Sequence, residues 1–239
     1  AIEFKKNGID PIVLDTRKSP NSEIIKEAKD LNINIKFSYV VVAAKGYKKV
    51  KSADIAKISD DKKNVSNIEN IGCDCICVSG FWTPTIHLAS QSGNKTKFKD
   101  EIDAFIPSQS KQKETTLGSA NGIFTLEETL KTSFEKGSEL SKQITNKENK
   151  IAVPAVVEKK SSNHDKFWCV PLPERKNYKR FLDFQNDVSV SDIQLALREG
   201  YRSIEHVKRY TTLGMATDQG RTSNLNGLQL VSDIENKVV

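Results

Sequence analysis

The first 44 residues alternate between short apolar runs and one amphipathic stretch. Pro11 to Asp15 is an apolar run that ends in an acid, and Asn34 to Ala44 is a second one. Between them, Ser22 to Leu31 has the spacing of a helix, with Asn21 or Ser22 as its N-cap. A strand, a helix and a second strand at this spacing predict a βαβ unit with parallel strands.

Residues 48 to 79 show the pattern of short strands. Lys48 to Ser59 alternates between polar and apolar positions, which predicts part of a small meander, and Asp60 to Asn64 has the composition of a turn. Gly72 to Ser79 is a continuous apolar run, which is typical of a buried parallel strand. We expect the three cysteines inside this run to be small buried residues, because a zinc site prefers Cys-x-x-Cys turns.

The middle of the chain is more polar. Residues 90–117 are irregular, and Gly118 to Gly122 has the composition of a tight glycine turn. Thr125 to Gln143 has a helical pattern, with Thr125 as the N-cap and Glu128 completing a capping box. Residues 144–175 carry many Lys, Asn, Ser and Pro residues, which predicts a linker.

From Tyr178 onward the pattern changes to short helices. We expect these at Ser191–Glu199, Ser203–Leu213 and Ser223–Asn236. The fold class is therefore α/β with a small all-α module behind it. The expected bounds are an α/β domain at 1–143, a linker at 144–175 and a helical domain at 176–239.

Composition limits the choice of partners and compartment. The chain has 239 residues, a formal net charge of +6 and a pI of about 9.0. A nucleic-acid partner would be indicated by basic clusters interleaved with aromatics, and Arg175 to Phe181 is the one short candidate; a solvated or phosphate-facing surface explains it more simply. The four cysteines do not form a secreted disulfide framework, so we expect a cytoplasmic protein. No run approaches the ~20 apolar residues of a membrane helix.

The run from Pro11 to Arg17 carries the most informative local chemistry. A strand that ends in an acid is where a Rossmann unit binds the adenosine ribose, because one carboxylate accepts hydrogen bonds from both ribose hydroxyls. Asp15 is the candidate carboxylate, and Arg17 is a candidate for contact with adenine or a 2′-phosphate. The glycine-rich phosphate loop precedes such an acid by about 20 residues, so we expect it to lie before Ala1 in a domain truncated at its N-terminus. A turn or cap acid and an exposed arginine are the alternative interpretation.

Three segments together resemble one protein family. The longest is residues 180–224, which begins Arg-Phe-Leu-Asp-Phe-Gln and ends Thr-Asp-Gln-Gly-Arg-Thr-Ser-Asn. The others are Cys73 to Leu88, with the run Val-Ser-Gly-Phe-Trp-Thr-Pro-Thr, and Gly118-Ser119-Ala120-Asn121-Gly122. In order and spacing these segments resemble the α subunit of heterotetrameric sarcosine oxidase, of which the chain is similar to an internal fragment.

The resemblance implies a fold. The first part would be a partial FAD/NAD(P)-binding domain of the two-dinucleotide, disulfide-reductase-like type. The second would be a small helical domain that resembles BFD-like [2Fe-2S] domains without their cysteines. The positions that match the cluster ligands are occupied by Asp183, Gln185, Asp218 and Ser223, so we expect no iron–sulfur cluster and no metal.

The resemblance also implies an activity and its cofactors. The complex would oxidatively demethylate sarcosine to glycine, with hydrogen peroxide and formaldehyde or methylene-tetrahydrofolate as products. NAD would bind the α dinucleotide domain, FMN the α/β interface, FAD the β subunit, and tetrahydrofolate a C-terminal region absent from this chain. Ser119 stands where related flavoproteins have an acid that holds FAD, which favours no FAD in this domain. The partners would be the β subunit and smaller subunits, with no nucleic acid and no membrane.

The candidate site residues follow from this pattern. We expect no catalytic residue in this chain, because the chemistry would lie on cofactors and in another subunit. A helix N-terminus with a nearby arginine suits a flavin phosphate, and a capped helix with local hydrogen bonds is the alternative. Trp82 covers a cofactor edge or serves packing. The candidate cofactor-binding residues are Asp15, Arg17, Gly80, Trp82, Arg209, Tyr210, Thr211, Thr212, Asp218, Gln219, Gly220, Arg221, Thr222, Ser223 and Asn224, with Lys208 beside them.

Two other functions remain compatible with the sequence. One is the α subunit of a related flavin-dependent enzyme that oxidises another secondary amine or amino acid. The other is a non-catalytic, basic helical adaptor that binds nucleic acid or protein. The fragment alone is expected to be inactive as an amine oxidase.

Overall fold

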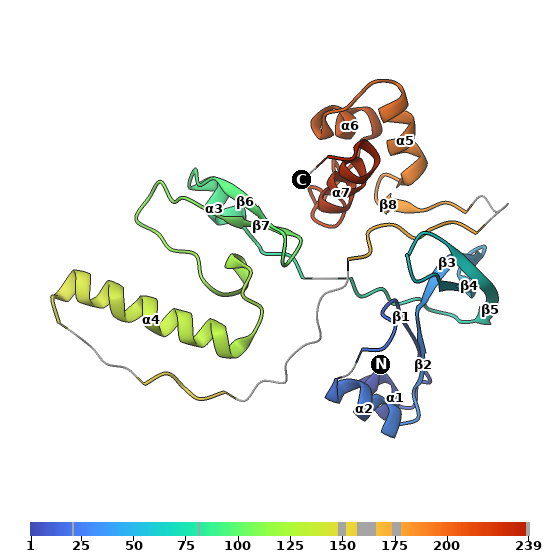
Figure 1. The fold of residues 1–239 in the computed structure, drawn as a ribbon, viewed down its shortest axis with the longest axis horizontal. Coiled ribbons are helices and arrows are strands. Elements are labelled where there is room, and N and C mark those ends of the chain that lie inside the picture. Colours follow the sequence, from blue (N-terminus) through green and yellow to red (C-terminus); the bar gives the residue numbers. More distant parts are fainter. Residues whose placement is uncertain (21, 81, 148–151, 157–165, 174–177, 238–239) are drawn as a thin grey trace. The chain divides into compact units, whose positions relative to one another are not determined.

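The computed structural model describes residues 1–20, 22–80, 82–147, 152–156, 166–173 and 178–237, which fall into two compact units (Figure 1). The first unit comprises Ala1–Val78 and Asp165–Val239, and the second comprises Ser79–His164. The expected bounds at 1–143, 144–175 and 176–239 stay a prediction. The predicted linker and the basic segment 175–181 lie partly outside the described residues.

The first unit opens with the predicted βαβ unit. Strand β1 (Ile12–Asp15) pairs in parallel with β2 (Asn34–Phe37), from Ile12 opposite Asn34 to Asp15 opposite Phe37. Between them lies α2 (Glu23–Asp30), whose N-cap Ser22 accepts a hydrogen bond from the Ile25 N–H at 3.4 Å. A short helix, α1 (Ile2–Lys6), precedes this unit. The βαβ prediction is confirmed.

A three-stranded antiparallel sheet follows, built from β3 (Tyr39–Gly46), β4 (Val50–Ile58) and β5 (Val65–Gly72) in that order. The predicted meander is therefore confirmed, but the single strand expected over Asn34 to Ala44 is wrong. Ser38 has a φ of 59° and divides that run between two sheets. Its N–H donates to the Arg17 carbonyl at 3.1 Å, and its carbonyl accepts the Ile58 N–H at 2.7 Å.

The predicted strand Gly72 to Ser79 is also wrong. β5 ends at Gly72, and beyond the Cys73 N–H, which donates to the Lys51 carbonyl at 3.1 Å, the segment joins no sheet in the part of the chain that the structure describes. Cys73 is half-buried, and Cys75 and Cys77 are exposed, so the expected burial of the three cysteines is wrong too. A buried parallel strand needs neighbouring strands to pair with. Among the described strands, β1 and β2 pair only with each other, so Gly72 to Ser79 has no parallel neighbour.

The second unit contains a short helix, a hairpin, a 3₁₀ helix and a long helix. Residues 90–117 were expected to be irregular, but they include the antiparallel pair β6 (Thr96–Lys99) and β7 (Ala104–Pro107) after α3 (His87–Gln91). Phe98 and Phe105 lie opposite each other with their ring centroids 5.2 Å apart. The glycine turn forms a 3₁₀ helix, η1 (Gly118–Asn121).

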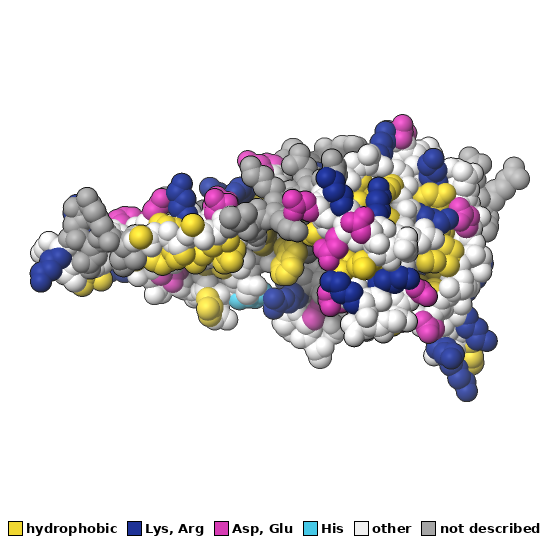
Figure 2. Space-filling model, turned by 90° about the horizontal axis from the view of Figure 1, so that it is seen from below, with side chains coloured by type: hydrophobic (Ala, Val, Ile, Leu, Met, Phe, Trp, Pro, Cys, Tyr) yellow, Lys and Arg dark blue, Asp and Glu magenta, His cyan; other side chains and the backbone are white. Residues whose placement is uncertain are grey.

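Helix α4 (Leu126–Thr145) is the longest described element, and it buries none of its residues. Thr125 occupies the N-cap position as predicted, but its side chain makes no capping hydrogen bond, so the predicted capping box is wrong. Hydrophobic side chains are visible on the surface of this unit in Figure 2. None of the described helices combines the length and the apolar character needed to cross a bilayer.

The C-terminal part of the first unit is a small helical module with three helices, as predicted. A hairpin of β8 (Phe181–Asp183) and β9 (Val188–Ser189) leads into α5 (Val190–Arg198), α6 (Ile204–Thr211) and α7 (Asn224–Glu235). Helix α5 begins with a capping box between Ser189 and Asp192. The module has its own core, formed by Leu182, Val188, Val190, Ile193, Ala196, Leu197, Val207, Leu213, Leu230 and Val231.

Candidate functional site

Asp15 lies at the carboxyl end of β1, where a Rossmann acid is expected. Its carboxylate is occupied by Arg17, whose Nε and Nη2 lie 3.0 and 2.7 Å from the two oxygens. The backbone N–H of Arg17 adds a bond of 2.9 Å to Oδ1. Arg17 is therefore turned onto the acid, and a ribose at this edge would compete with its guanidinium for the same carboxylate.

The charge of Asp15 follows from these contacts. Partial burial raises the pKa of the carboxyl, but the hydrogen bonds and the charge of Arg17 outweigh that effect and hold the pKa below its ordinary value. The carboxylate is thus ionised at neutral pH, as an acceptor for hydroxyl groups must be.

Gly80 and Trp82 belong to the second unit, and both are exposed. A Cβ at Gly80 would meet open space, so no close approach requires glycine there. Trp82 is 80% exposed, which is incompatible with a packing role within its unit. Phe81, between them, lies outside the described residues.

The end of α6 carries four of the candidate cofactor-binding residues, Arg209 to Thr212. Thr211 donates its hydroxyl to the Val207 carbonyl at 2.8 Å, and Thr212 ends the helix in the left-handed region with a φ of 62°. Arg209 and Tyr210 are exposed, and the Tyr210 ring lies 4.8 Å from that of Tyr201. Tyr210 and Thr211 also line a hollow of ~320 Å³ together with Asn186, Asp187, Val188, Asp192 and Leu195.

The candidate residues that precede α7 form a turn closed by Asp218. Its Oδ1 accepts the Gly220 N–H at 3.1 Å, and its Oδ2 accepts the hydroxyl of Thr222 at 2.8 Å and the N–H of Thr222 at 3.3 Å. The Thr222 hydroxyl and these amides lower the pKa of the Asp218 carboxyl below its ordinary value. Because Asp218 already supplies the anion at these amides, a phosphate has to be held by other groups.

Asn224 packs between two glycines, which explains the close approach of the loop to α7. A Cβ at Gly214 would lie 2.0 Å from the Asn224 amide oxygen, and a Cβ at Gly220 would lie 2.2 Å from the amide nitrogen. Both glycines have positive φ angles, of 67° and 74°. Glycine is therefore required at both positions for steric and for conformational reasons.

Ser223 occupies the N-cap position of α7, but its side chain does not cap the helix. Ser223 is fully buried, and its hydroxyl has no hydrogen-bond partner among the described residues. The same holds for the Asn224 amide oxygen. Two buried polar atoms without partners at a helix start leave hydrogen-bonding capacity that a ligand or water can take up.

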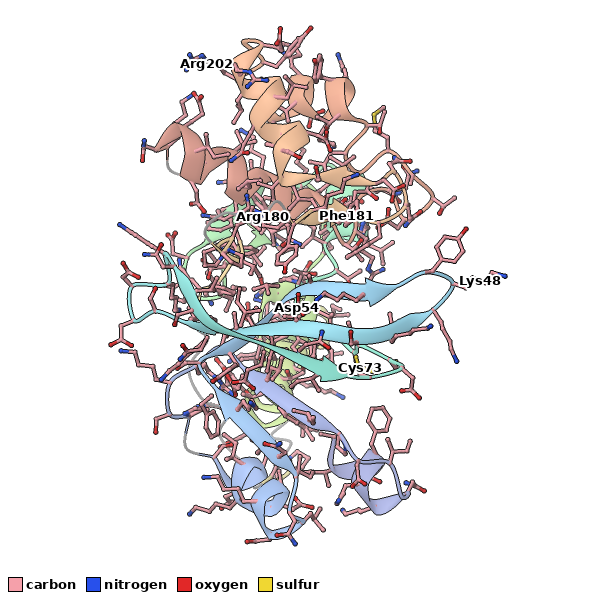
Figure 3. The ribbon with its side chains drawn as sticks, turned by 90° about the vertical axis from the view of Figure 1, so that its right-hand side faces the viewer. Lys48, Asp54, Cys73, Arg180, Phe181 and Arg202 are labelled. Carbon is pink, nitrogen blue, oxygen red and sulfur yellow. The ribbon has the colours of Figure 1, made fainter. Side chains whose placement is uncertain are left out.

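The sequence missed one buried polar cluster, around Asp54 in β4. Asp54 is 2% exposed, and it accepts hydrogen bonds from Asn70 at 2.8 Å and from the Tyr178 hydroxyl at 2.8 Å, beside Lys45 at 2.8 Å. Figure 3 shows Asp54 on the sheet, near the segment that carries Arg180 and Phe181. The only sequence signal was an acid between two apolar residues of a strand, Ala53 and Ile55.

Comparisons with known proteins relate this chain to sarcosine oxidase α subunits. A family model of the sarcosine oxidase A3 domain matches residues 177–239, which include the whole of the helical module from β8 to α7. The α subunit of sarcosine oxidase from Rhizobium meliloti (strain 1021) is 30% identical over 97% of this chain. The chain is homologous to sarcosine oxidase α subunits. The α subunit from Corynebacterium sp. (strain U-96) is 28% identical over 77% of the chain.

The homology covers only part of those relatives. This α-subunit-like chain spans 22% of the length of the Rhizobium protein and 19% of the Corynebacterium protein. The crystal structure of L-proline dehydrogenase from P. horikoshii has a similar fold, with a TM-score of 0.50 and 17% identity over 95% of this chain and 45% of that chain. The mixed α/β fold with an A3 domain at its C-terminus is thus shown.

Proposed function

We propose that this chain is the part of a sarcosine-oxidase-type α subunit that binds NAD and contributes the α side of an interfacial FMN site. The observation that carries the proposal is the loop before α7, where the buried Ser223 hydroxyl has no described partner inside the module matched by the A3 domain. Its first part is a partial two-dinucleotide domain, in line with the βαβ unit and the meander behind it. The alternative of a nucleic-acid or protein adaptor has no comparable support in the structure.

The residues of the loop fit a phosphate-bearing flavin. Arg221 provides positive charge just before the start of α7, whose positive dipole end favours an anion, and Arg209 is exposed on α6. The amides of Gly220 and Thr222 donate to Asp218, so the Ser223 hydroxyl is the group whose hydrogen-bonding capacity is left for a phosphate oxygen, and the arginines would add positive charge. FMN would supply the electron transfer to oxygen, and this chain would bind and orient it.

NAD binding at β1 would depend on the Asp15 carboxylate. Asp15 has the position and the charge for a ribose, but Arg17 holds both of its oxygens. We infer that the ribose hydroxyls replace the guanidinium, which then turns outward. The whole complex would convert sarcosine to glycine, with FAD in the β subunit and tetrahydrofolate in a folate-binding region.

The flavin role is tested with the α subunit that contains this segment, co-expressed with its β subunit. Arg221→Ala is expected to lower the FMN content of the purified complex about 10-fold, because one charge-assisted phosphate bond is lost. Arg198→Ala, on α5 of the same module, makes the same charge change and should leave the FMN content unaltered. Equal FMN content in both variants would refute the proposed site.

A second function has one observation in its favour. The fold resembles that of an L-proline dehydrogenase, so the complex could oxidise another secondary amine. Turnover of the assembled complex with sarcosine and L-proline separates the two. A preference for sarcosine of 10-fold or more in kcat/KM supports the first proposal, and the reverse preference supports the second.

A further inference from the structure

Asp183, at the end of β8, is a buried carboxylate whose partners come from two different segments. It is 3% exposed, and its Oδ1 accepts the N–H groups of Gln185 at 2.8 Å and Asn186 at 3.2 Å. Its Oδ2 accepts the N–H of Gly214 at 2.9 Å. The first two bonds shape the β8–β9 turn, and the third reaches the loop that follows α6. A buried charge with backbone donors on both sides therefore joins the turn to the loop.

Two further hydrogen bonds connect the same pair of segments. The Asn186 side-chain amide donates to the Thr212 carbonyl at 2.9 Å. The Thr217 hydroxyl donates to the Gln185 side-chain oxygen at 2.6 Å. The loop from 212 to 217 is thus held at its start, its middle and its end by neighbouring residues of one turn.

The bond at Gly214 acts at the most crowded point of the loop. Gly214 packs against Asn224, the first residue of α7, with space for no side chain. A shift of the Gly214 backbone would therefore move Asn224 or collide with it. The position of Asp183 is transmitted through Gly214 to the start of α7, where Ser223 lies.

We propose that Asp183 is a positioning residue, which fixes the loop from Thr212 to Thr217 and, through it, the residues from Asp218 to Asn224. That these residues face a flavin rests on the proposed function. The fixing of the loop rests on the hydrogen bonds alone.

Amide hydrogen exchange of the 239-residue chain tests the fixing of the loop. Asp183→Asn keeps one acceptor oxygen and puts an NH₂ group in place of the other, so the loop loses at least one bond to a charged acceptor. Exchange in residues 212–217 is expected to become about 10-fold faster. Asp187→Asn makes the same charge change at an exposed position of the same turn and should have no effect. If Asp183→Asn does not fold, Thr217→Val, which removes only the bond to Gln185, should show a smaller change in the same direction.

A spectroscopic readout separates this inference from the proposed function. In the assembled complex, Asp183→Asn is expected to shift the visible absorbance of bound FMN, and Asp233→Asn, at an exposed residue of α7 that does not line the hollow, is not. Unchanged amide exchange of the loop in Asp183→Asn would overturn the positioning role, whether or not the flavin spectrum shifts. If Asp183→Asn does not fold, unchanged exchange in Thr217→Val would overturn it. Faster exchange with an unchanged flavin spectrum would support the fixing of the loop and overturn the flavin-facing role.

Discussion

At the scale of single residues, Asp54 links the sheet to the segment before the helical module. The hydrogen bond from Lys45 lowers the pKa of the Asp54 carboxyl to about 2, with help from Asn70 and Tyr178 and against the effect of burial. The Tyr178 hydroxyl is the partner from outside the sheet, since Lys45 and Asn70 both lie on neighbouring strands. The cluster therefore ties the chain before β8 to β4.

Removal of this link should destabilise the first unit. Tyr178→Phe leaves a buried carboxylate with one partner fewer, and we expect a loss of about 1–2 kcal/mol in the free energy of unfolding. Tyr47→Phe is the matched control, because Tyr47 is 95% exposed. Urea denaturation followed by circular dichroism measures both. A Tyr178→Phe curve that overlays the control would contradict the role given to the cluster.

The same cluster predicts a dependence of stability on pH. The folded pKa of Asp54, about 2, lies below the unfolded value of 3.8, so its contribution is fully present above pH ~4 and is lost as the pH falls toward 2. We expect about 1–2 kcal/mol from this group, because Lys45 is half-exposed and screened. Stability of Asp54→Asn, measured by denaturation from pH 5 to pH 2.5, should fall less steeply than that of the unaltered chain. Parallel pH curves would exclude Asp54 as the source.

Gly220 is a second residue whose identity the structure fixes. Gly220→Ala places a Cβ against Asn224 in a backbone with positive φ, and we expect a cost of about 2–3 kcal/mol in the free energy of unfolding. Gly137→Ala in α4 meets no atom within 4 Å and should not lower the melting temperature. Thermal denaturation of the two variants provides the comparison, and an unaltered melting temperature for Gly220→Ala would rule out the packing described for the loop.

At the scale of elements, helix starts give the sharpest contrast between sequence and structure. Ser189 and Asp192 cap α5 reciprocally, whereas Thr125, which has the same sequence signature with Glu128, caps nothing in α4. Ser189→Ala is therefore expected to cost about 1 kcal/mol, and Thr125→Ala close to nothing. Denaturation midpoints of the two variants test this difference. Equal losses of stability in the two variants would mean that the sequence signature, and not the observed hydrogen bonds, determines the contribution of the N-cap residue.

The sequence predicted those elements that depend on local periodicity. The three helices of the A3-like module and the βαβ unit were predicted correctly, because their apolar periodicity and capping residues lie within a few residues of each other. The sequence-based prediction failed where pairing between distant segments determines the secondary structure. Ser38 breaks a long apolar run because two sheets bond to it, and Gly72 to Ser79 forms no strand because no described strand pairs with it.

At the scale of the whole molecule, the candidate site was predictable only as a set of residue types. The loop from Thr217 to Asn224 was found from its resemblance to a family, and its three-point attachment to the β8–β9 turn was not, because Asp183, Gln185 and Asn186 are distant in sequence. The predicted half-site at Asp15 was found from one strand and one acid. Its occupation by Arg17 depends on side-chain geometry that no spacing rule contains.

We propose that the loop before α7 faces a flavin at a subunit interface, and an experimental structure of the assembled α/β complex with FMN is the decisive test. FMN phosphate oxygens are expected within hydrogen-bond distance of Arg209, Arg221 or Ser223, with Asp183 still bound to the Gly214 N–H. A loop that lies in bulk solvent, with the flavin held by other residues, would contradict it.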